Sequence, residues 1–550
     1  MPILTFDNVS ISYRVQTGSG PGRIQAVDGV TLTVPPGATV GLAGESGCGK
    51  STLAMSALRL LPPNALVEGT VSLGGEDVAG MSWGRLRAVR WTEASIVFQG
   101  AMHSLNPVRR VRQQIAEALL VHAKARTSVY RDGAERDRRV AELLQQVDLD
   151  PDQADAFPHE LSGGQKQRVM IAMALACDPE LIIADEPTTA LDVVVQSQVL
   201  ALLGSLVESR NLALIMISHD LSILAATCER IVVMHEGRIV ESGPSADVIG
   251  NPQHPHTQAL ASAFPTIGDP ASRRRLPGYR APAAAPAAAA SGPPTLQAKA
   301  ISVVFRSRKG PVKAVDRVDL DCRPGEIVAL VGQSGSGKTT LARTLLGLQQ
   351  PSSGQVLVKG VPLDRSRKAL KAYRKSVQFV LQDPMAALNP RHSVYEAVAE
   401  GIRLHRLPGD ESELVAEALR KAELYPAERY LRAIPQELSG GQRQRVVIAG
   451  ALALDPEFLI ADEPVASLDA SVRAEILALL LRLRCEFGLG ALVITHDLGL
   501  AWNIADRVVV MYRGRIVEAG PVESVLLEPQ HEYTRKLLSV VPAHPGRTIG

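Results

Sequence analysis

The stretch GESGCGKS, from Gly44 to Ser51, decides the fold, and GQSGSGKT, from Gly332 to Thr339, repeats it later in the chain. Three further motifs recur in the same order after each stretch. They are LSGGQ at 161–165 and 438–442, ADEP at 184–187 and 461–464, and a His-Asp pair at 219–220 and 496–497. Because a whole set of motifs is duplicated, the repeat indicates two complete domains of one kind and not a short structural repeat.

The bulk composition excludes several classes of protein. Over 550 residues, 59 Lys and Arg balance 57 Asp and Glu, so no overall charge attracts nucleic acid or anionic lipid. The five cysteines are scattered without metal-ligand spacing, which argues against zinc and favours a reducing compartment. The N-terminus does not resemble a signal peptide. Apolar runs are much shorter than the roughly 20 residues that span a bilayer, so other chains would have to cross any membrane involved.

Composition and spacing divide the chain into domains at 1–264 and 295–550, joined by an Ala/Pro-rich linker at 265–294. The prolines predict an extended, semi-stiff tether. Its Arg273 to Arg275 run could touch lipid headgroups or nucleic acid, but a solvated charge cluster is the favoured interpretation.

The expected fold class is α/β, with a sheet core and a helical lobe in each domain. Apolar runs at 38–43, 181–184 and 213–217 predict buried strands of a largely parallel sheet, and 195–209 has helical periodicity. The copies differ in length between the glutamines (Gln99, Gln382) and LSGGQ, which predicts a peripheral helical lobe there.

Each glycine loop follows an apolar strand and opens a helix, as a phosphate-binding loop does. Glycines let backbone N–H groups converge on phosphate oxygens, and the helix N-terminus adds its positive end. Lys50 and Lys338 would reach the β- and γ-phosphates, and Ser51 and Thr339 would ligate Mg²⁺. Cys48 is interpreted as a small filler residue in preference to a reactive thiol. The expected ATP-binding residues of the two loops are Gly44, Ser46, Gly47, Gly49, Lys50, Ser51 and Thr52, and Gly332, Ser334, Gly335, Gly337, Lys338, Thr339 and Thr340.

An acid pair ends an apolar strand in each copy. Asp185 and Asp462 are placed to hold the Mg²⁺ shell, while Glu186 and Glu463 could orient a water molecule and accept its proton. A buried structural acid pair is the alternative, disfavoured by the phosphate loop upstream.

The LSGGQ motif forms a second anion-binding turn before a helix. One domain does not need two such turns for one nucleotide, so we expect head-to-tail pairing, in which each copy's LSGGQ covers the other's γ-phosphate. The residues expected to do so are Ser162, Gly163, Gly164 and Gln165, and Ser439, Gly440, Gly441 and Gln442.

Together these residues resemble the ATP-binding-cassette ATPases over nearly the whole chain. The resemblance implies two hydrolytic sites, since neither copy has lost a motif. It implies that Gln99 and Gln382 contact Mg²⁺ or the attacking water, that His219 and His496 stabilise the γ-phosphate, and that Asp192 and Asp469 couple the sites. The implied Mg²⁺ sets are Ser51, Gln99 and Asp185, and Thr339, Gln382 and Asp462. Tyr13 and Phe305 are expected to stack on adenine, with core packing as the alternative.

Two further segments narrow the resemblance. The first segment surrounds each glutamine loop and reads FQGAMHSLNPV at 98–108 and LQDPMAALNPR at 381–391. The second follows each ATPase core and reads NPQHPHTQAL at 251–260 and EPQHEYTRKLL at 528–538. These are similar to the dipeptide, oligopeptide and nickel importer subfamily. That implies a peripheral ATPase on the cytoplasmic face of the inner membrane, with two transmembrane permease subunits, an extracytoplasmic solute-binding protein and no nucleic acid.

Several features of this importer interpretation stay open. The solute could be a dipeptide, an oligopeptide, glutathione, an opine or a nickel chelate. No iron–sulfur cluster is expected, because no cysteine follows either HxxT segment. The first copy departs from the pattern at Gly100-Ala101 and at His256, which we expect to affect contacts with partners and not hydrolysis. The alternatives are a soluble tandem ATPase acting on ribosomes or DNA, and an exporter ATPase.

Overall fold

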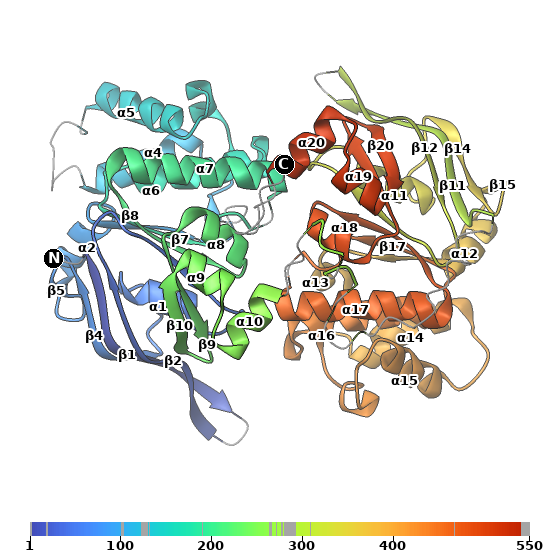
Figure 1. The fold of residues 1–550 in the computed structure, drawn as a ribbon, viewed down its shortest axis with the longest axis horizontal. Helices are drawn as coiled ribbons and strands as arrows, with labels where there is room; N and C mark the ends of the chain where they lie inside the picture. Colours follow the sequence, from blue (N-terminus) through green and yellow to red (C-terminus); the bar gives the residue numbers. More distant parts are fainter. Residues whose placement is uncertain are drawn as a thin grey trace. The chain divides into compact units, whose positions relative to one another are not determined.

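The structure is a computed structural model that divides into two compact units, residues 1–264 and 265–541, called here the first and second unit. It describes residues 3–17, 20–98, 100, 104–122, 130, 132–189, 191–262, 267–270, 272–274, 276, 279, 293–307, 310–466 and 468–540. The predicted α/β class with two similar domains is confirmed (Figure 1).

The first unit contains an antiparallel sheet and a mixed sheet. The antiparallel sheet has the order β2-β1-β4-β5, and the mixed one has the order β10-β9-β3-β8-β7-β6. Their strands are β1 (Leu4–Thr17), β2 (Gly20–Val34), β3 (Thr39–Ala43), β4 (Ala65–Leu73), β5 (Glu76–Asp77), β6 (Ala94–Val97), β7 (Leu181–Asp185), β8 (Ala213–Ser218), β9 (Arg230–His235) and β10 (Arg238–Pro244). Only the β9-β10 pair of the second sheet is antiparallel.

Helices cover these sheets and form a separate lobe. They are α1 (Lys50–Ser56), α2 (Trp83–Val89), α4 (Val111–His122), α5 (Gly133–Gln146), α6 (Gly163–Leu175), α7 (Val193–Arg210), α8 (Leu221–Thr227), α9 (Ser245–Gly250) and α10 (Pro255–Ser262). Figure 1 shows α4 and α5 grouped with α6 to one side of the sheets. Of these, α4 and α5 lie between Gln99 and LSGGQ, where the sequence predicted a helical lobe.

The second unit repeats this plan. Its sheets have the orders β12-β11-β14-β15 and β16-β17-β18-β13-β19-β20. The strands are β11 (Leu296–Ser307), β12 (Gly310–Cys322), β13 (Ile327–Val331), β14 (Ser353–Val358), β15 (Val361–Pro362), β16 (Val377–Val380), β17 (Phe458–Asp462), β18 (Gly490–Thr495), β19 (Arg507–Tyr512) and β20 (Arg515–Pro521). The helices are α11 (Lys338–Leu345), α12 (Arg367–Ser376), α13 (Pro384–Ala387), α14 (Val394–His405), α15 (Glu411–Lys421), α16 (Gly440–Leu452), α17 (Ala470–Phe487), α18 (Leu498–Ile504), α19 (Val522–Leu527) and α20 (Glu532–Ser539).

The central strands place the functional motifs. Every residue of β3, β7 and β8 is buried, which matches the continuous apolar runs expected of parallel strands covered on both faces. Since parallel strands end at one edge, the phosphate loop after β3, the acid pair after β7 and the histidine after β8 lie at the same edge. In the described part of the chain, no helix combines the length and apolarity needed to cross a bilayer.

Part of the predicted linker belongs to the second unit and packs against its core. Leu276 is buried in the apolar cluster of that unit, and the Trp502 indole N–H donates to Ser272 Oγ at 3.3 Å. Arg273 pairs with Glu523, and Arg274 Nη2 lies 2.6 Å from Asp506 Oδ1. The expectation of a solvated charge cluster is therefore wrong for Arg273 and Arg274, because acidic groups of the second unit hold both guanidiniums. Arg275 lies outside the described residues.

This anchoring predicts a stability effect confined to the second unit. Replacing Arg273 and Arg274 by Ala should lower its free energy of unfolding by about 1 to 2 kcal/mol, since both ion pairs are only partly buried. Trp502 is the only tryptophan after residue 91. Its fluorescence in a Trp83→Phe, Trp91→Phe background would therefore report urea unfolding of this unit. Arg367→Ala, on an exposed residue of α12, is the matched control. An equal effect from that control would contradict the anchoring.

Candidate functional site

The phosphate loop of each unit is folded around a buried lysine. Lys50 is 6% exposed, and its Nζ donates to the carbonyls of Gly44 at 2.8 Å and Glu45 at 2.7 Å. Lys338 makes the equivalent bonds to Gly332 at 2.6 Å and Gln333 at 2.8 Å. A buried ammonium is costly unless it is paired. These carbonyls satisfy it and hold it in the curl of the loop.

Glycine is required where this loop touches its neighbours. Gly49 has φ of 101°, and a Cβ built there would lie 2.2 Å from the Ala26 carbonyl oxygen. Gly44, with φ of 146°, would bring a Cβ to 2.3 Å from the Met234 carbonyl oxygen. The predicted glycines therefore serve the loop's close packing as well as its openness to phosphate.

The aspartates that end β7 and β17 are buried. Asp185 is 2% exposed, and its Oδ1 has no hydrogen-bond partner in the structure. Burial raises the pKa of Asp185, and a hydrogen bond from the Ser51 side chain opposes this rise. The pKa of Asp462 rises for the same reason, opposed by Thr339. An unpartnered buried carboxylate oxygen beside a hydroxyl forms an oxygen donor set of the kind that suits Mg²⁺.

The glutamates that follow meet the histidines after β8 and β18. His219 Nδ1 lies 3.3 Å from Glu186 Oε1, and His496 Nδ1 lies 3.0 Å from Glu463 Oε1. Both glutamates adopt left-handed backbone conformations, with φ of 46° and 47°. Such a conformation is uncommon for glutamate, and its repetition indicates that each carboxylate is held at a set position.

Each glutamate accepts a further hydrogen bond. Thr189 Oγ1 donates to Glu186 Oε2 at 2.8 Å, and Gln382 Nε2 donates to Glu463 Oε2 at 2.8 Å. Burial would raise the pKa of Glu186, but hydrogen bonds from His219 and Thr189 outweigh it and lower the pKa to about 2. The pKa of Glu463 is lowered by His496 against the same effect of burial. Both carboxylates therefore stay ionised at neutral pH.

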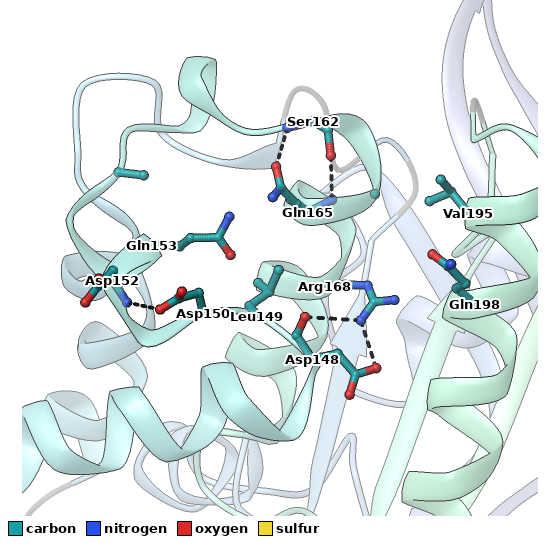
Figure 2. Close-up of a pocket in the computed structure, with 12 residues that line it drawn as sticks. Asp148, Leu149, Asp150, Asp152, Gln153, Ser162, Gln165, Arg168, Val195 and Gln198 are labelled. Atoms are coloured by element: carbon teal, nitrogen blue, oxygen red, sulfur yellow. Dashed lines mark hydrogen bonds and ion pairs between the residues drawn. The ribbon is translucent and has the colours of Figure 1, made fainter. Parts of the chain in front are cut away.

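The LSGGQ turns begin α6 and α16. Ser162 Oγ accepts from the Gln165 N–H at 3.3 Å, while the Gln165 side chain accepts from the Ser162 N–H at 2.9 Å. Figure 2 shows this capping box at the rim of a cavity of 690 Å³ that Asp148, Asp150 and Arg168 also line. Ser439 and Gln442 form the same box in the second unit. The residues that line the cavity include none from the phosphate loop or the acid pair of the same unit.

The aromatic residues expected at adenine differ in their exposure. Phe305 is 43% exposed, so core packing does not account for it. Tyr13 is half-buried, and its hydroxyl lies 3.1 Å from Thr52 Oγ1, which ties β1 to α1. Asp192 caps α7 by accepting from the Val195 N–H at 3.1 Å. Gln99 lies outside the described residues.

Four contacts at these sites, two of them equivalent salt bridges, were not predicted from the sequence. They are the Thr189 bond to Glu186, the paired salt bridges Asp28–Arg238 and Asp316–Arg515, and a bond between Tyr533 and the second phosphate loop. The salt bridges could have been found, because Asp28 and Asp316 recur in AVD and Arg238 and Arg515 recur in GRIV. The other two contacts differ between the copies, so the repeat gives no signal for them.

One packing contact of the LSGGQ turn allows a sharp test. A Cβ added at Gly164 would lie 2.3 Å from Val195 Cγ1, where α6 meets α7. Gly164→Ala should therefore destabilise the first unit by about 1 to 3 kcal/mol through overpacking. Adding Val195→Ala should recover most of this loss, as measured by denaturant unfolding. No recovery in the double variant would show that steric contact is not the cause.

Comparisons with known proteins agree with this geometry. A family model described as "ABC transporter" matches residues 27–189 and 315–466. A second, "Oligopeptide/dipeptide transporter, C-terminal region", matches 240–292 and 517–549.

Relatives match along almost the entire chain. The glutathione import ATP-binding protein GsiA of Escherichia coli (strain K12) is 39% identical over 577 residues, covering 99% of this chain and 90% of that protein. The peptidoglycan transport ATP-binding protein YejF of Agrobacterium fabrum is 42% identical, covering 98% and 96%. The solved structure of cbiO1 from Clostridium perfringens is 33% identical, covers 43% of this chain and 92% of its own, and has a TM-score of 0.39. The chain thus belongs to the ABC transporter family, as an ATP-binding and ATP-hydrolysing subunit of the importer type.

Proposed function

We propose that this chain energises the uptake of a small peptide-like solute by hydrolysing ATP at two sites. The observation that carries the proposal is the oligopeptide/dipeptide transporter region that follows both ATPase cores. The relatives named for glutathione import and peptidoglycan transport support the solute class, since glutathione is a peptide and peptidoglycan contains peptides. Two permease chains and an extracytoplasmic binding protein would choose the solute, with this chain at the cytoplasmic face of the inner membrane.

Each proposed site combines the phosphate loop of one unit with the LSGGQ turn of the other. The support is that Ser162 and Gln165 line a cavity whose lining residues include neither Lys50 nor Glu186 of the same unit. Lys50 would bind the phosphates from one side, and the N-terminus of α16 at Ser439 would bind from the other. Opposed positive groups suit the charge that develops on the transferred phosphoryl group.

The acid pair and the histidine would position the attacking water. Glu186 is ionised and held at 3.3 Å from His219, so it can accept a hydrogen bond from water and turn the water's lone pair toward the γ-phosphate. A carboxylate with a pKa of about 2 is a weak base, so orienting the water would be the larger part of its role. His219 would then donate to the γ-phosphate. Glu463 and His496 would act alike in the second site.

Residues of each unit would also hold Mg²⁺. The oxygen ligands would come from Ser51 and Asp185 in the first unit and from Thr339, Asp462 and Gln382 in the second. We propose Gln99 as the counterpart of Gln382 in the first unit. When bound, Mg²⁺ would neutralise charge on the β- and γ-phosphate oxygens. The unpartnered Asp185 Oδ1 supports this assignment.

Turnover by charge-neutral variants tests the two-site proposal. Glu186→Gln and Glu463→Gln should each lower ATP hydrolysis to half or less, because each removes the water-orienting carboxylate of one site. The double variant should lose about 10²-fold or more. Phosphate release and ATP occupancy at neutral pH would be measured together, since both variants should still bind ATP. Full turnover in either single variant would exclude a working role for that site.

Partner capture tests the importer proposal. A tagged chain with both substitutions, held in the ATP-bound state, should recover two permease chains and a solute-binding protein from native membranes. A Lys50→Ala, Lys338→Ala bait, which should not bind ATP, is the control for the state dependence. The recovered binding protein would be screened against small peptides, glutathione and peptidoglycan fragments. Recovery of ribosomes or DNA-repair proteins without a membrane chain would refute the proposal.

A further inference from the structure

A pair of rings in close contact links the end of a strand to the segment that follows each ATPase core. In the second unit, the rings of Tyr512 on β19 and Tyr533 on α20 stack with centroids 4.1 Å apart. In the first unit, His235 on β9 and His256 on α10 hold the same positions with centroids 4.0 Å apart. Both members of the pair therefore differ together between the two units.

Tyr533 reaches the phosphate loop of its own unit. The Gln333 N–H donates to the Tyr533 hydroxyl oxygen at 3.0 Å, and Tyr533 is 7% exposed. The carbonyl of the same Gln333 accepts from Lys338 Nζ at 2.8 Å. Both polar backbone groups of Gln333 are thus bonded, one to the phosphate-binding lysine and the other to Tyr533. The tyrosine hydroxyl therefore helps to position the loop that holds Lys338.

The same turn brings His256 to the corresponding place. Glu518 accepts from the backbone N–H groups of Gln530 and His531, at 2.8 and 3.1 Å, just before Tyr533. In the first unit, Glu241 accepts from those of Gln253 and His254, at 2.9 and 3.0 Å, just before His256. The two turns are built alike, and His256 packs against His235 where Tyr533 stacks on Tyr512. In the described part of the first unit, however, His256 makes no bond to the loop like the one between Tyr533 and Gln333.

The imidazole differs from the phenol in that it can be protonated near neutral pH. The groups around it are His235 on β9, His254 in the turn, Glu45 in the phosphate loop and Lys50 on α1. Its Nε2 is buried without a hydrogen-bond partner. Burial, followed by the nearby His235, lowers the pKa of His256, so the ring is neutral at pH 7.

Protonation would change what His256 can do. The neutral ring carries no charge, whereas an imidazolium donates at both nitrogens and would place a positive charge in a buried position beside the phosphate loop. A second positive charge would also repel Lys50 and weaken the contact with His235. Tyrosine, with an ordinary pKa near 10, undergoes no such change.

We propose that the segment after each ATPase core acts on its own phosphate loop, through the hydrogen bond of Tyr533 in the second unit and through the protonation of the buried His256 in the first, and that only the first site loses ATP affinity in acid. This inference rests on the proposed function in one respect, namely that both sites bind ATP. Tyr533 and His256 are positioning residues, because they act through the loop.

ATP binding at one site at a time tests the proposal on the full chain. Lys338→Ala leaves the first site and Lys50→Ala leaves the second, and a fluorescent ATP analogue is titrated between pH 8 and pH 5. The Kd of the first site should rise by up to about tenfold per pH unit below the pKa of His256. The Kd of the second site should rise only by the amount that results from protonation of the ATP analogue itself. Equal pH dependence at the two sites would overturn the inference, whereas no binding at either site at pH 8 would instead contradict the proposed function.

Exchange variants separate positioning from mere packing. His235→Tyr with His256→Tyr should give the first site the flat profile of the second, and Tyr512→His with Tyr533→His should give the second the acid-sensitive profile. Tyr533→Phe keeps the stack but removes the acceptor, so it should raise the Kd of the second site about 3- to 10-fold at pH 8 without adding pH dependence. Unchanged affinity in Tyr533→Phe, or unexchanged profiles, would refute the positioning role.

Discussion

A lysine ammonium buried beneath a glycine loop is the constraint on which each unit depends. Lys50 and Lys338 are almost fully removed from water, and backbone carbonyls of their own loops hold them. Burying a charge is tolerated only where geometry satisfies it. This requires a loop without side chains in the way, a strand that delivers it and a helix that begins at the lysine. The order β3, loop, α1 and its repeat β13, loop, α11 meet all three requirements.

The sheet order then assembles the remaining chemistry. Strands β7 and β8 are parallel neighbours of each other, and β8 also pairs with β3. Their carboxyl ends therefore bring Asp185, Glu186 and His219 to the edge that carries Lys50. The left-handed conformation of Glu186 is explained by the same arrangement, because its N–H donates to the Ile217 carbonyl on β8 at 3.0 Å. The unfavourable left-handed conformation of Glu186 thus holds its carboxylate beside His219.

The sequence was sufficient to predict the elements and motifs that recur in both copies of the repeat. Apolar periodicity predicted the strands before the motifs and the helix at 193–210. The length difference between the copies predicted the lobe before LSGGQ. The sequence failed where long-range packing decides. Arg273 and Arg274 looked like a solvated run, since nothing local shows that Asp506 and Glu523 lie beside them. The bond between Tyr533 and the second phosphate loop was also missed, because nothing near Tyr533 in the sequence indicates that loop.

The two units differ less in the groups proposed to touch the nucleotide than in the residues around those groups. The groups proposed to touch phosphate or Mg²⁺ are nearly the same in both, because the charge and geometry of the nucleotide fix them. One layer further out, Thr189 bonds Glu186 where the second unit has Ala466, and a histidine pair replaces a tyrosine pair. Thr189 bonds a carboxylate and Tyr533 bonds a loop, so residues in this outer layer can change the strength of a site without changing its chemistry. A duplicated ATPase on one chain can in this way keep two hydrolytic centres and still give each its own response to conditions.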